Sequence, residues 1–258
     1  MKILSHILSP IFILTFVLLL VIFHPIQWIG LKVFGYNGHK KVVDVLNFCL
    51  VKSMLLIGVT VSLKNEHDLP KDASLVFVSN HQSISDIPPL SVFFRKHHPK
   101  FVAKIELGKG VPSVSFNLKY GGAALINRKD GKQAIAELGR FSKNIHKNKW
   151  GAIIFPEGTR SRNGQPKKFS TNGLKMITKY NPEGYIVPIT INNSWKIFKY
   201  GKYPLGIGSP ITLTVHKPIK IDSLPFDDLI KETESMLFSR VSITSLLIFC
   251  IDIQLFYV

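Results

Sequence analysis

Two short polar segments carry the residues of this chain that could do chemistry. Residues 80–86 read Asn-His-Gln-Ser-Ile-Ser-Asp and place His81 five positions before Asp86. An imidazole can accept a proton as a general base, and a carboxylate beside it can orient the ring and stabilise its charged form. Residues 155–161 read Phe-Pro-Glu-Gly-Thr-Arg-Ser. A tight loop there would let backbone N–H groups and the Arg160 guanidinium converge on phosphate oxygens.

The pairing of His81 with Asp86 needs a break in regular structure. An α-helix advances about 100° per residue, so positions i and i+5 lie about 140° apart and cannot share a face. The apolar run Ser74–Ser79 predicts a buried strand, and Asp86–Leu90 predicts the start of a helix. We therefore expect His81 on the strand-to-helix connection, with a turn that brings its ring to Asp86. The alternative is a pair that only caps the helix.

Composition indicates one main domain and an anionic partner. The chain has 258 residues, of which 46% are hydrophobic, enough to bury one substantial core beside a membrane-proximal segment. Its formal charge of +17 is concentrated in residues 95–181, which hold 19 Lys and Arg against four Asp and Glu. Such a surface suits a phosphate-bearing substrate, an acidic lipid surface or nucleic acid. Because the sequence lacks interleaved aromatic and basic residues and any recognised helix module, we expect no nucleic-acid partner.

Both ends of the chain are apolar. Ile3–Phe23 is long enough to cross a bilayer, which takes about 20 residues. A cleaved signal peptide is the alternative, which the long apolar run and the absence of a small-residue cleavage site at His24-Pro25 disfavour. Polar residues interrupt the next apolar stretch, Val42–Val61, which favours a helix lying at the membrane interface. We divide the chain into membrane-anchoring helices (residues 1–61), a main domain (62–240) and an apolar tail (241–258).

The distribution of lysines predicts the orientation of the chain. Lys2 alone precedes the first apolar segment, whereas several lysines follow it, and the positive-inside rule then places the main domain at the cytoplasmic face of a membrane.

Between the apolar ends, the sequence alternates between strand and helix patterns. Residues 130–148 place apolar side chains along one stripe, with Asp130 as the N-cap of the predicted helix. This alternation predicts an α/β fold with a mixed sheet flanked by helices. The expected strands are Leu75–Ser79, Phe101–Ala103, Ala123–Asn127, Ala152–Phe155, Tyr185–Ile191 and Ile211–Val215.

Two more segments bear on the site. A small-residue turn at Gly121-Gly122 leads into a predicted strand that delivers Arg128 at its end, in position for an anion, unless the arginine is simply solvated in a loop. The predicted strand Tyr185–Ile189 has Pro188 in its middle, which by itself indicates only an edge strand or a bulge.

Taken in chain order, these four segments form the four sequence blocks of a known family. They resemble the glycerolipid acyltransferase family, specifically its 1-acylglycerol-3-phosphate acyltransferase branch, over about residues 60–220. The His-x₄-Asp block is matched at Asn80, His81 and Asp86, the second at Gly122 and Arg128, the third at Phe155–Ser161, and the fourth weakly at Val187, Pro188 and Ile189. Lys104 also resembles a basic position of that family, and Asn127 stands where aspartate is common.

The resemblance implies an acyltransferase-like fold with N-terminal membrane helices and a defined chemistry. A fatty acyl group passes from acyl-coenzyme A or acyl carrier protein, as co-substrate, to the hydroxyl of a lysophospholipid at a phospholipid membrane, with no other cofactor. His81 would take the hydroxyl proton and Asp86 would hold the ring, with no acyl-enzyme. The implied phosphate-binding residues are Arg128, Glu157, Gly158, Thr159 and Arg160, with Lys104, Asn80 and Pro188 in support. We expect Glu157 to orient an arginine.

The acceptor is the open point within that resemblance. Glycerol-3-phosphate acyltransferases tend to carry Gly-Gly-Arg where this chain has Gly158-Thr159-Arg160, so Thr159 favours lysophosphatidate, with phosphatidic acid as the product. Another lysophospholipid or glycerol-3-phosphate is the alternative acceptor. A metal site is disfavoured, because one histidine and one carboxylate at this spacing lack a third ligand. Two non-enzyme readings remain: a membrane-tethered basic protein that binds anions or nucleic acid, and an inactive lipid-binding scaffold.

Overall fold

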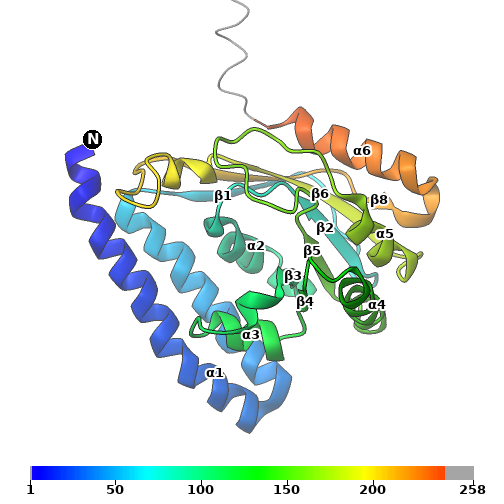
Figure 1. Cartoon of the computed structure of the whole chain (residues 1–258), viewed down its shortest axis with the longest axis horizontal. Coiled ribbons are helices and arrows are strands. Elements are labelled where there is room, and N and C mark those ends of the chain that lie inside the picture. Colours follow the sequence, from blue (N-terminus) through cyan, green and yellow to red (C-terminus); the bar gives the residue numbers. More distant parts are fainter. Residues whose placement is uncertain (1, 242–258) are drawn as a thin grey trace, which may run out of the picture.

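The computed structural model describes residues 2–241 and has one mixed sheet between two layers of helices (Figure 1). The fold class predicted from the sequence is confirmed. The expected apolar tail lies, beyond Val241, outside the described residues. The strands are β1 Val61–Asn65, β2 Leu75–Ser79, β3 Lys100–Lys104, β4 Ala124–Ile126, β5 Gly151–Ile154, β6 Tyr185–Asn192, β7 Ile211–Val215 and β8 Ile219–Lys220.

The sheet has the strand order β1-β7-β6-β2-β5-β3-β4, with β8 paired to β6. Strand β2 lies at its centre and runs parallel to β5 and β6, whereas β6 and β7 are antiparallel. All five residues of β2 are buried, as expected of a parallel strand that is covered on both faces. The carboxyl ends of β2 and β5 therefore meet at one edge of the sheet, and the two polar segments of the sequence follow those ends.

Pro188 stands in an interior strand, so of the two predicted alternatives, an edge strand or a bulge, the edge strand is wrong. It lies opposite Val78 of β2. On the other side of β6, residues 185 and 186 pair with β8, and the pairing with β7 begins at Ile189. Pro188 thus occupies the point at which the neighbouring strand changes. A residue without a backbone N–H is tolerated there because the ladder is already interrupted.

The helices are α1 Lys2–Ser53, α2 Ile87–Phe93, α3 Val114–Tyr120, α4 Gly131–Asn148, α5 Thr171–Lys179 and α6 Phe226–Ser239. Side chains of a strand alternate between faces, and β2 divides accordingly. Val76 and Val78 pack with α4, α5 and α6 in one core. Leu75 and Phe77 pack with α2 and part of α1 in the other. The sheet is thereby held from both sides.

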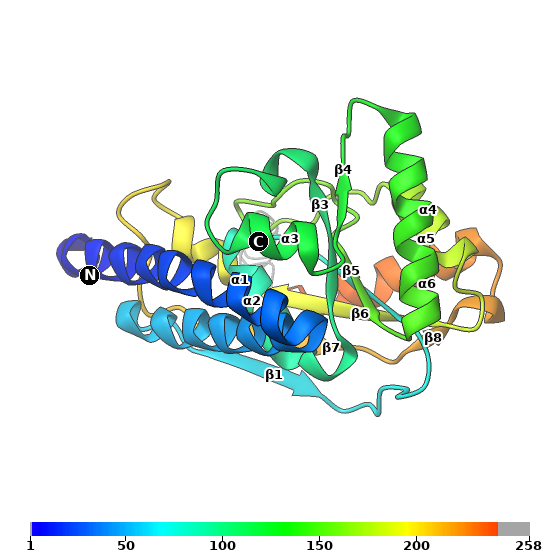
Figure 2. The same cartoon turned by 90° about the horizontal axis from the view of Figure 1, so that it is seen from below.

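Helix α1 is a hairpin of two arms. Its backbone reverses at Gly35, where φ is +62° and ψ is −153°, a conformation that glycine adopts without strain. The arms lie side by side (Figure 2), and a Cβ atom on Gly38 would come within 2.5 Å of the Gly30 carbonyl oxygen. The second arm ends earlier than predicted, because a short 3₁₀ turn ends at Ile57 and Val61 already begins β1.

The hairpin packs against the rest of the molecule along its length. Near its start, the Ser9 hydroxyl accepts a hydrogen bond from the Leu205 N–H at 2.8 Å. At its turn, the Tyr36 ring stacks on Trp150, and the Tyr36 hydroxyl accepts from the Lys100 ammonium at 2.9 Å. The outward faces of the arms remain apolar and exposed. Residues Lys2–Ile57 form a helical segment long and apolar enough to cross a membrane, by length and composition.

The helix predicted over residues 130–148 is confirmed. The Asp130 carboxylate accepts a hydrogen bond from the Gln133 N–H at 3.0 Å and caps helix α4, which ends at Asn148. One member of its apolar stripe differs from expectation, because Ile135 is 56% exposed and faces a cavity instead of the core. All six predicted strands are present. Strands β1 and β8 were not predicted, since β1 is half polar and β8 is only two residues long.

Candidate active site

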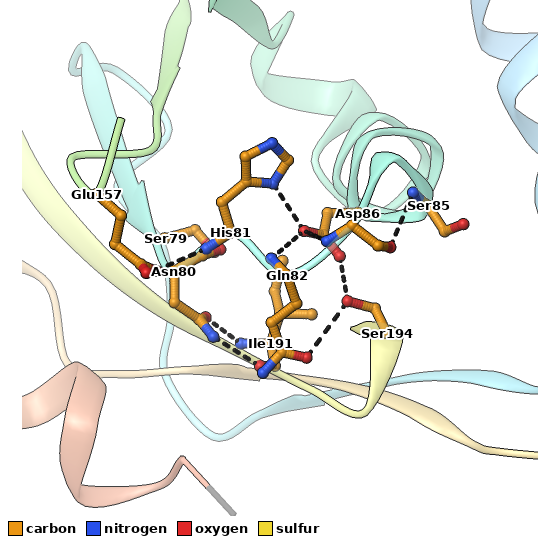
Figure 3. A network of polar contacts seen from close by, with 10 residues as sticks. Ser79, Asn80, His81, Gln82, Ser85, Asp86, Glu157, Ile191 and Ser194 are labelled. Atoms are coloured by element: carbon orange, nitrogen blue, oxygen red, sulfur yellow. Dashed lines mark hydrogen bonds and ion pairs between the residues drawn. The ribbon is translucent and has the colours of Figure 1, made fainter. Parts of the chain in front are cut away.

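A tight turn after β2 brings His81 onto Asp86. Residues 84–86 form a 3₁₀ turn in which Ser83 is the N-cap, and the Ser83 hydroxyl accepts from the Ser85 N–H at 3.0 Å. The Asp86 carboxylate folds back and accepts the N–H groups of Gln82 at 2.8 Å and Ser83 at 2.9 Å. The same oxygen, Oδ2, lies 2.8 Å from His81 Nδ1 (Figure 3). The predicted turn is confirmed, and capping turns out to be the device that aims the carboxylate.

The environment of the pair sets its protonation pattern. The Asp86 side chain is fully buried, whereas 18% of the His81 side chain is exposed. Since the carboxylate accepts, Nδ1 of the neutral ring carries the hydrogen and Nε2 presents its lone pair. The His81 ring stacks on Phe155 with a centroid separation of 4.1 Å, which fixes the plane of the ring. Within residues 2–241 Nε2 has no hydrogen-bond partner, so it is available to a substrate proton.

The segment after β5 holds the backbone of His81 from both sides. Glu157 Oε1 accepts the His81 N–H at 2.9 Å, and the Ser161 N–H donates to the His81 carbonyl at 2.7 Å. Gly158 between them has φ +68°, which requires glycine. His81 and the predicted anion-binding loop are therefore parts of one hydrogen-bonded unit.

Glu157 has a different role from the predicted one. Its carboxylate binds two backbone N–H groups, those of His81 and Lys167, instead of orienting an arginine. Burial raises the pKa of the Glu157 carboxyl, and the two backbone hydrogen bonds together with the charge of Lys167 oppose that rise. Glu157 thus joins the two polar segments through backbone hydrogen bonds.

Arg128 converges on the same loop, as expected. It follows β4, and its Nη1 donates to the Gly158 carbonyl oxygen. Lys167, which the sequence did not single out, also stabilises the loop, because its ammonium donates at 3.0 Å both to the Thr159 hydroxyl and to the Arg160 carbonyl. The Arg160 side chain makes no ion pair within the described part of the chain and stays available for an anion.

A cavity of about 1860 Å³ runs from His81 between the hairpin and the main domain. Its lining has two chemical characters. The cationic part comprises Lys104, Arg128, Arg160, Arg162, Lys167 and Lys175. The apolar part comes from both arms of the hairpin and from helices α2 to α5, with Phe16, Leu20, Leu46, Leu50, Leu118 and Met176 among its members. The arrangement suits a ligand with an anionic head and a long apolar chain.

Comparison with known proteins identifies the family. The model of the Acyltransferase family matches residues 60–192, which include both polar segments and more than half of the chain. The chain belongs to the acyltransferase family. This acyltransferase brings His81, Asp86 and a cationic cavity together in one connected site.

Several relatives of the acyltransferase are named 1-acyl-sn-glycerol-3-phosphate acyltransferase. The protein of Borreliella burgdorferi is 25% identical over 188 residues, covering 73% of this chain and 72% of its own length. That of Saccharomyces cerevisiae is 29% identical over 210 residues, covering 79% of this chain and 61% of its own. That of Helicobacter pylori is 33% identical over 142 residues, covering 54% and 56%.

A solved structure shows the same fold. The crystal structure of the 1-acyl-sn-glycerophosphate (LPA) acyltransferase PlsC from Thermotoga maritima superposes with a TM-score of 0.77 and 22% sequence identity. The superposition covers 93% of this chain and 96% of that one, so the helical hairpin and the sheet are shared along with the site region.

The remaining predicted residues divide into those at the cavity and those away from it. Lys104, at the end of β3, lines the cavity of the acyltransferase. The Asn80 side chain is buried and pairs with the Ile191 backbone, donating at 2.8 Å and accepting at 2.7 Å. Asn80 therefore connects β6 to the His81 segment and does not line the cavity. Pro188 does not reach the cavity either. Arg162 lies in the cavity wall, and its place two positions after Arg160 in one loop was an available signal.

Proposed function

We propose that this acyltransferase transfers a fatty acyl group from an acyl thioester to the sn-2 hydroxyl of 1-acyl-glycerol-3-phosphate, giving phosphatidic acid for phospholipid synthesis. The observation that carries the proposal is the His81–Asp86 pair at 2.8 Å, whose free Nε2 opens on a cavity with cationic and apolar parts. The names of the relatives support the choice of acceptor.

The proposed reaction uses the lone pair of His81 Nε2. It takes the proton of the acceptor hydroxyl while the hydroxyl oxygen attacks the thioester carbonyl. The new C–O ester bond forms, the C–S bond breaks, and the departing thiolate recovers the proton from the imidazolium. Asp86 stabilises the imidazolium through the bond to Nδ1. General-base assistance of this kind contributes about 10²- to 10⁴-fold in rate. The remainder comes from positioning and from stabilising the oxyanion.

The acceptor phosphate is assigned to the cationic part of the cavity. The Arg160 guanidinium, which has no ion-pair partner within residues 2–241, would bind the phosphate bidentately, with Arg128 and Arg162 beside it. The hydrogen-bonded loop around Gly158 and Thr159 would fix the position of these arginines relative to His81. The apolar wall would receive an acyl chain. Because the acyl donor brings an apolar chain with either acceptor, the preference for a lysophospholipid over glycerol-3-phosphate rests on the names of the relatives.

The donor and the membrane complete the proposal. The donor is acyl-coenzyme A or acyl carrier protein, and the reaction as written uses no further cofactor and no metal. Residues 1–61 would anchor the enzyme through the exposed apolar faces of the hairpin, with the main domain at the cytoplasmic face. Lysolipid substrate and phosphatidic acid product both reside in the bilayer, so anchoring shortens the path of each lipid between the bilayer and the active site.

The experiment that tests the proposal measures free-thiol release from oleoyl-coenzyme A by membranes that contain the protein. Lysophosphatidate, glycerol-3-phosphate and no acceptor are compared, and the lipid product is identified by mass spectrometry. Release that depends on lysophosphatidate, with phosphatidic acid as the product, is expected. Release that depends on glycerol-3-phosphate instead would overturn the acceptor assignment. Inactivity with every acceptor and with acyl carrier protein as the donor would overturn the proposed reaction.

A further inference from the structure

Ser194 lies beside the buried carboxylate of Asp86, although 108 residues separate them in the sequence. It begins the 3₁₀ turn Ser194–Phe198 that follows β6, and it is fully buried. The Ser194 hydroxyl donates to Asp86 Oδ1 (Figure 3). Oδ2, the other oxygen, accepts from His81 Nδ1 and from two backbone N–H groups. Ser194 thus binds the carboxylate oxygen that His81 does not use.

The position of Ser194 is fixed by its neighbours. Strand β6 is joined to the His81 segment through the paired hydrogen bonds between Asn80 and the Ile191 backbone. The next residue, Trp195, packs against Gly164, where a Cβ atom would lie 2.4 Å from the indole Nε1. Gly164 in turn donates its N–H to the Ser161 carbonyl at 3.3 Å. The turn after β6 therefore contacts both the Asp86 carboxylate and the loop that carries Arg160.

A fully buried carboxylate stays ionised only if hydrogen bonds replace its water. The Ser194 hydroxyl has one hydrogen and two acceptors within reach, Asp86 Oδ1 and, at 3.4 Å, Gln82 Oε1. The shorter contact assigns that hydrogen to Asp86. Holding Oδ1 also fixes the rotation of the carboxylate, which keeps Oδ2 aimed at His81 Nδ1.

We propose that Ser194 is a positioning residue of the acyltransferase and that it acts through Asp86. It lies outside the four sequence blocks that predicted the site, and it touches neither the cavity nor the reacting atoms. The inference rests on the proposed role of His81 as the general base. Ser194 would keep Asp86 charged and correctly rotated, so that the imidazolium formed during proton transfer is stabilised.

The test compares Ser194→Ala, which removes the hydroxyl, with Ser194→Cys, which keeps the size and a weak donor. Rates are measured per mole of folded enzyme, beside the wild type in the same membranes. Removing a hydrogen bond to a charged group changes the equilibrium or rate constant that depends on it by a factor of about 10 to 100. We expect that loss in kcat for Ser194→Ala, an unchanged KM for the acceptor, and an intermediate kcat for Ser194→Cys. We also expect the acid limb of the pH–rate profile of Ser194→Ala to move to lower pH, because a rotated or less fully charged Asp86 stabilises the imidazolium less.

A double mutant separates action through Asp86 from general damage. If Ser194 acts through Asp86, adding Ser194→Ala to Asp86→Asn lowers the remaining rate by less than about twofold, because coupled residues are not additive. Independent multiplication of the two losses would overturn the inference. So would a Ser194→Ala enzyme with the kcat and pH profile of an active wild type. An inactive wild type would instead refute the proposed function, so the two failures are distinguishable.

Discussion

The Glu157 carboxylate accepts the backbone N–H of His81 at 2.9 Å, and this bond joins the proposed general base to the loop that carries Arg160. A second bond, from the Ser161 N–H to the His81 carbonyl, closes the connection. In the proposed function, proton transfer by His81 and phosphate binding by the loop then depend on each other, because the two segments are hydrogen-bonded together. A shift of one segment displaces the other.

Changing Glu157 should impair both functions together. Glu157→Gln retains one carbonyl acceptor and loses the other, so one of the two backbone N–H groups is left unpaired. We expect kcat with lysophosphatidate to fall about 10- to 100-fold, the scale of a lost hydrogen bond to a charged group, and KM to rise with it. Steady-state kinetics at several acceptor concentrations measure both constants. A rise in KM alone would mean that Glu157 serves only the phosphate.

Glu157→Gln should also change how the stability of the fold depends on pH. Because burial raises the folded-state pKa of Glu157, its contribution to stability is full below the unfolded value and is lost as pH rises through the folded value. A glutamine does not titrate, so Glu157→Gln removes this loss of stability with rising pH. We therefore expect the melting temperature of the variant to gain on that of the wild type as pH rises above about 4.3, the ordinary pKa of a glutamate carboxyl. A difference that stays constant over this range would contradict the assignment.

Arg160 should act on acceptor affinity. Arg160→Ala removes a guanidinium from the cavity wall, and we expect KM for lysophosphatidate to rise about 10-fold or more while kcat changes little. Lys168→Ala is the matched control, because Lys168 is exposed on the same loop but does not line the cavity. Equal effects of the two changes would indicate general electrostatics instead of direct phosphate binding.

The sequence predicts best what is decided locally. The strand before His81, the helix after Asp86 and the cap at Asp130 follow from neighbouring residues, and all three are present. The turn between His81 and Asp86 could also be inferred, because the spacing excludes a helix and capping residues supply the alternative.

What could not be predicted depends on residues far apart in the chain. The partners of the Glu157 carboxylate are set by how β2 and β5 end beside each other, so its charge alone suggested an arginine. Ser194 meets Asp86 only because β6 pairs with β2. The reversal at Gly35 requires a backbone conformation that no local pattern specified, so the packing of the two arms into a hairpin was not predicted.

The most direct test of the account is lysophosphatidate-dependent thiol release by His81→Ala. The account predicts a fall of about 10²-fold or more at saturating acceptor, because the general base is lost. The amount of protein in the membrane fraction should stay the same, since the hairpin that would anchor the enzyme does not depend on the imidazole. A His81→Ala enzyme that releases thiol at close to the wild-type rate would contradict the central claim that His81 accepts the proton.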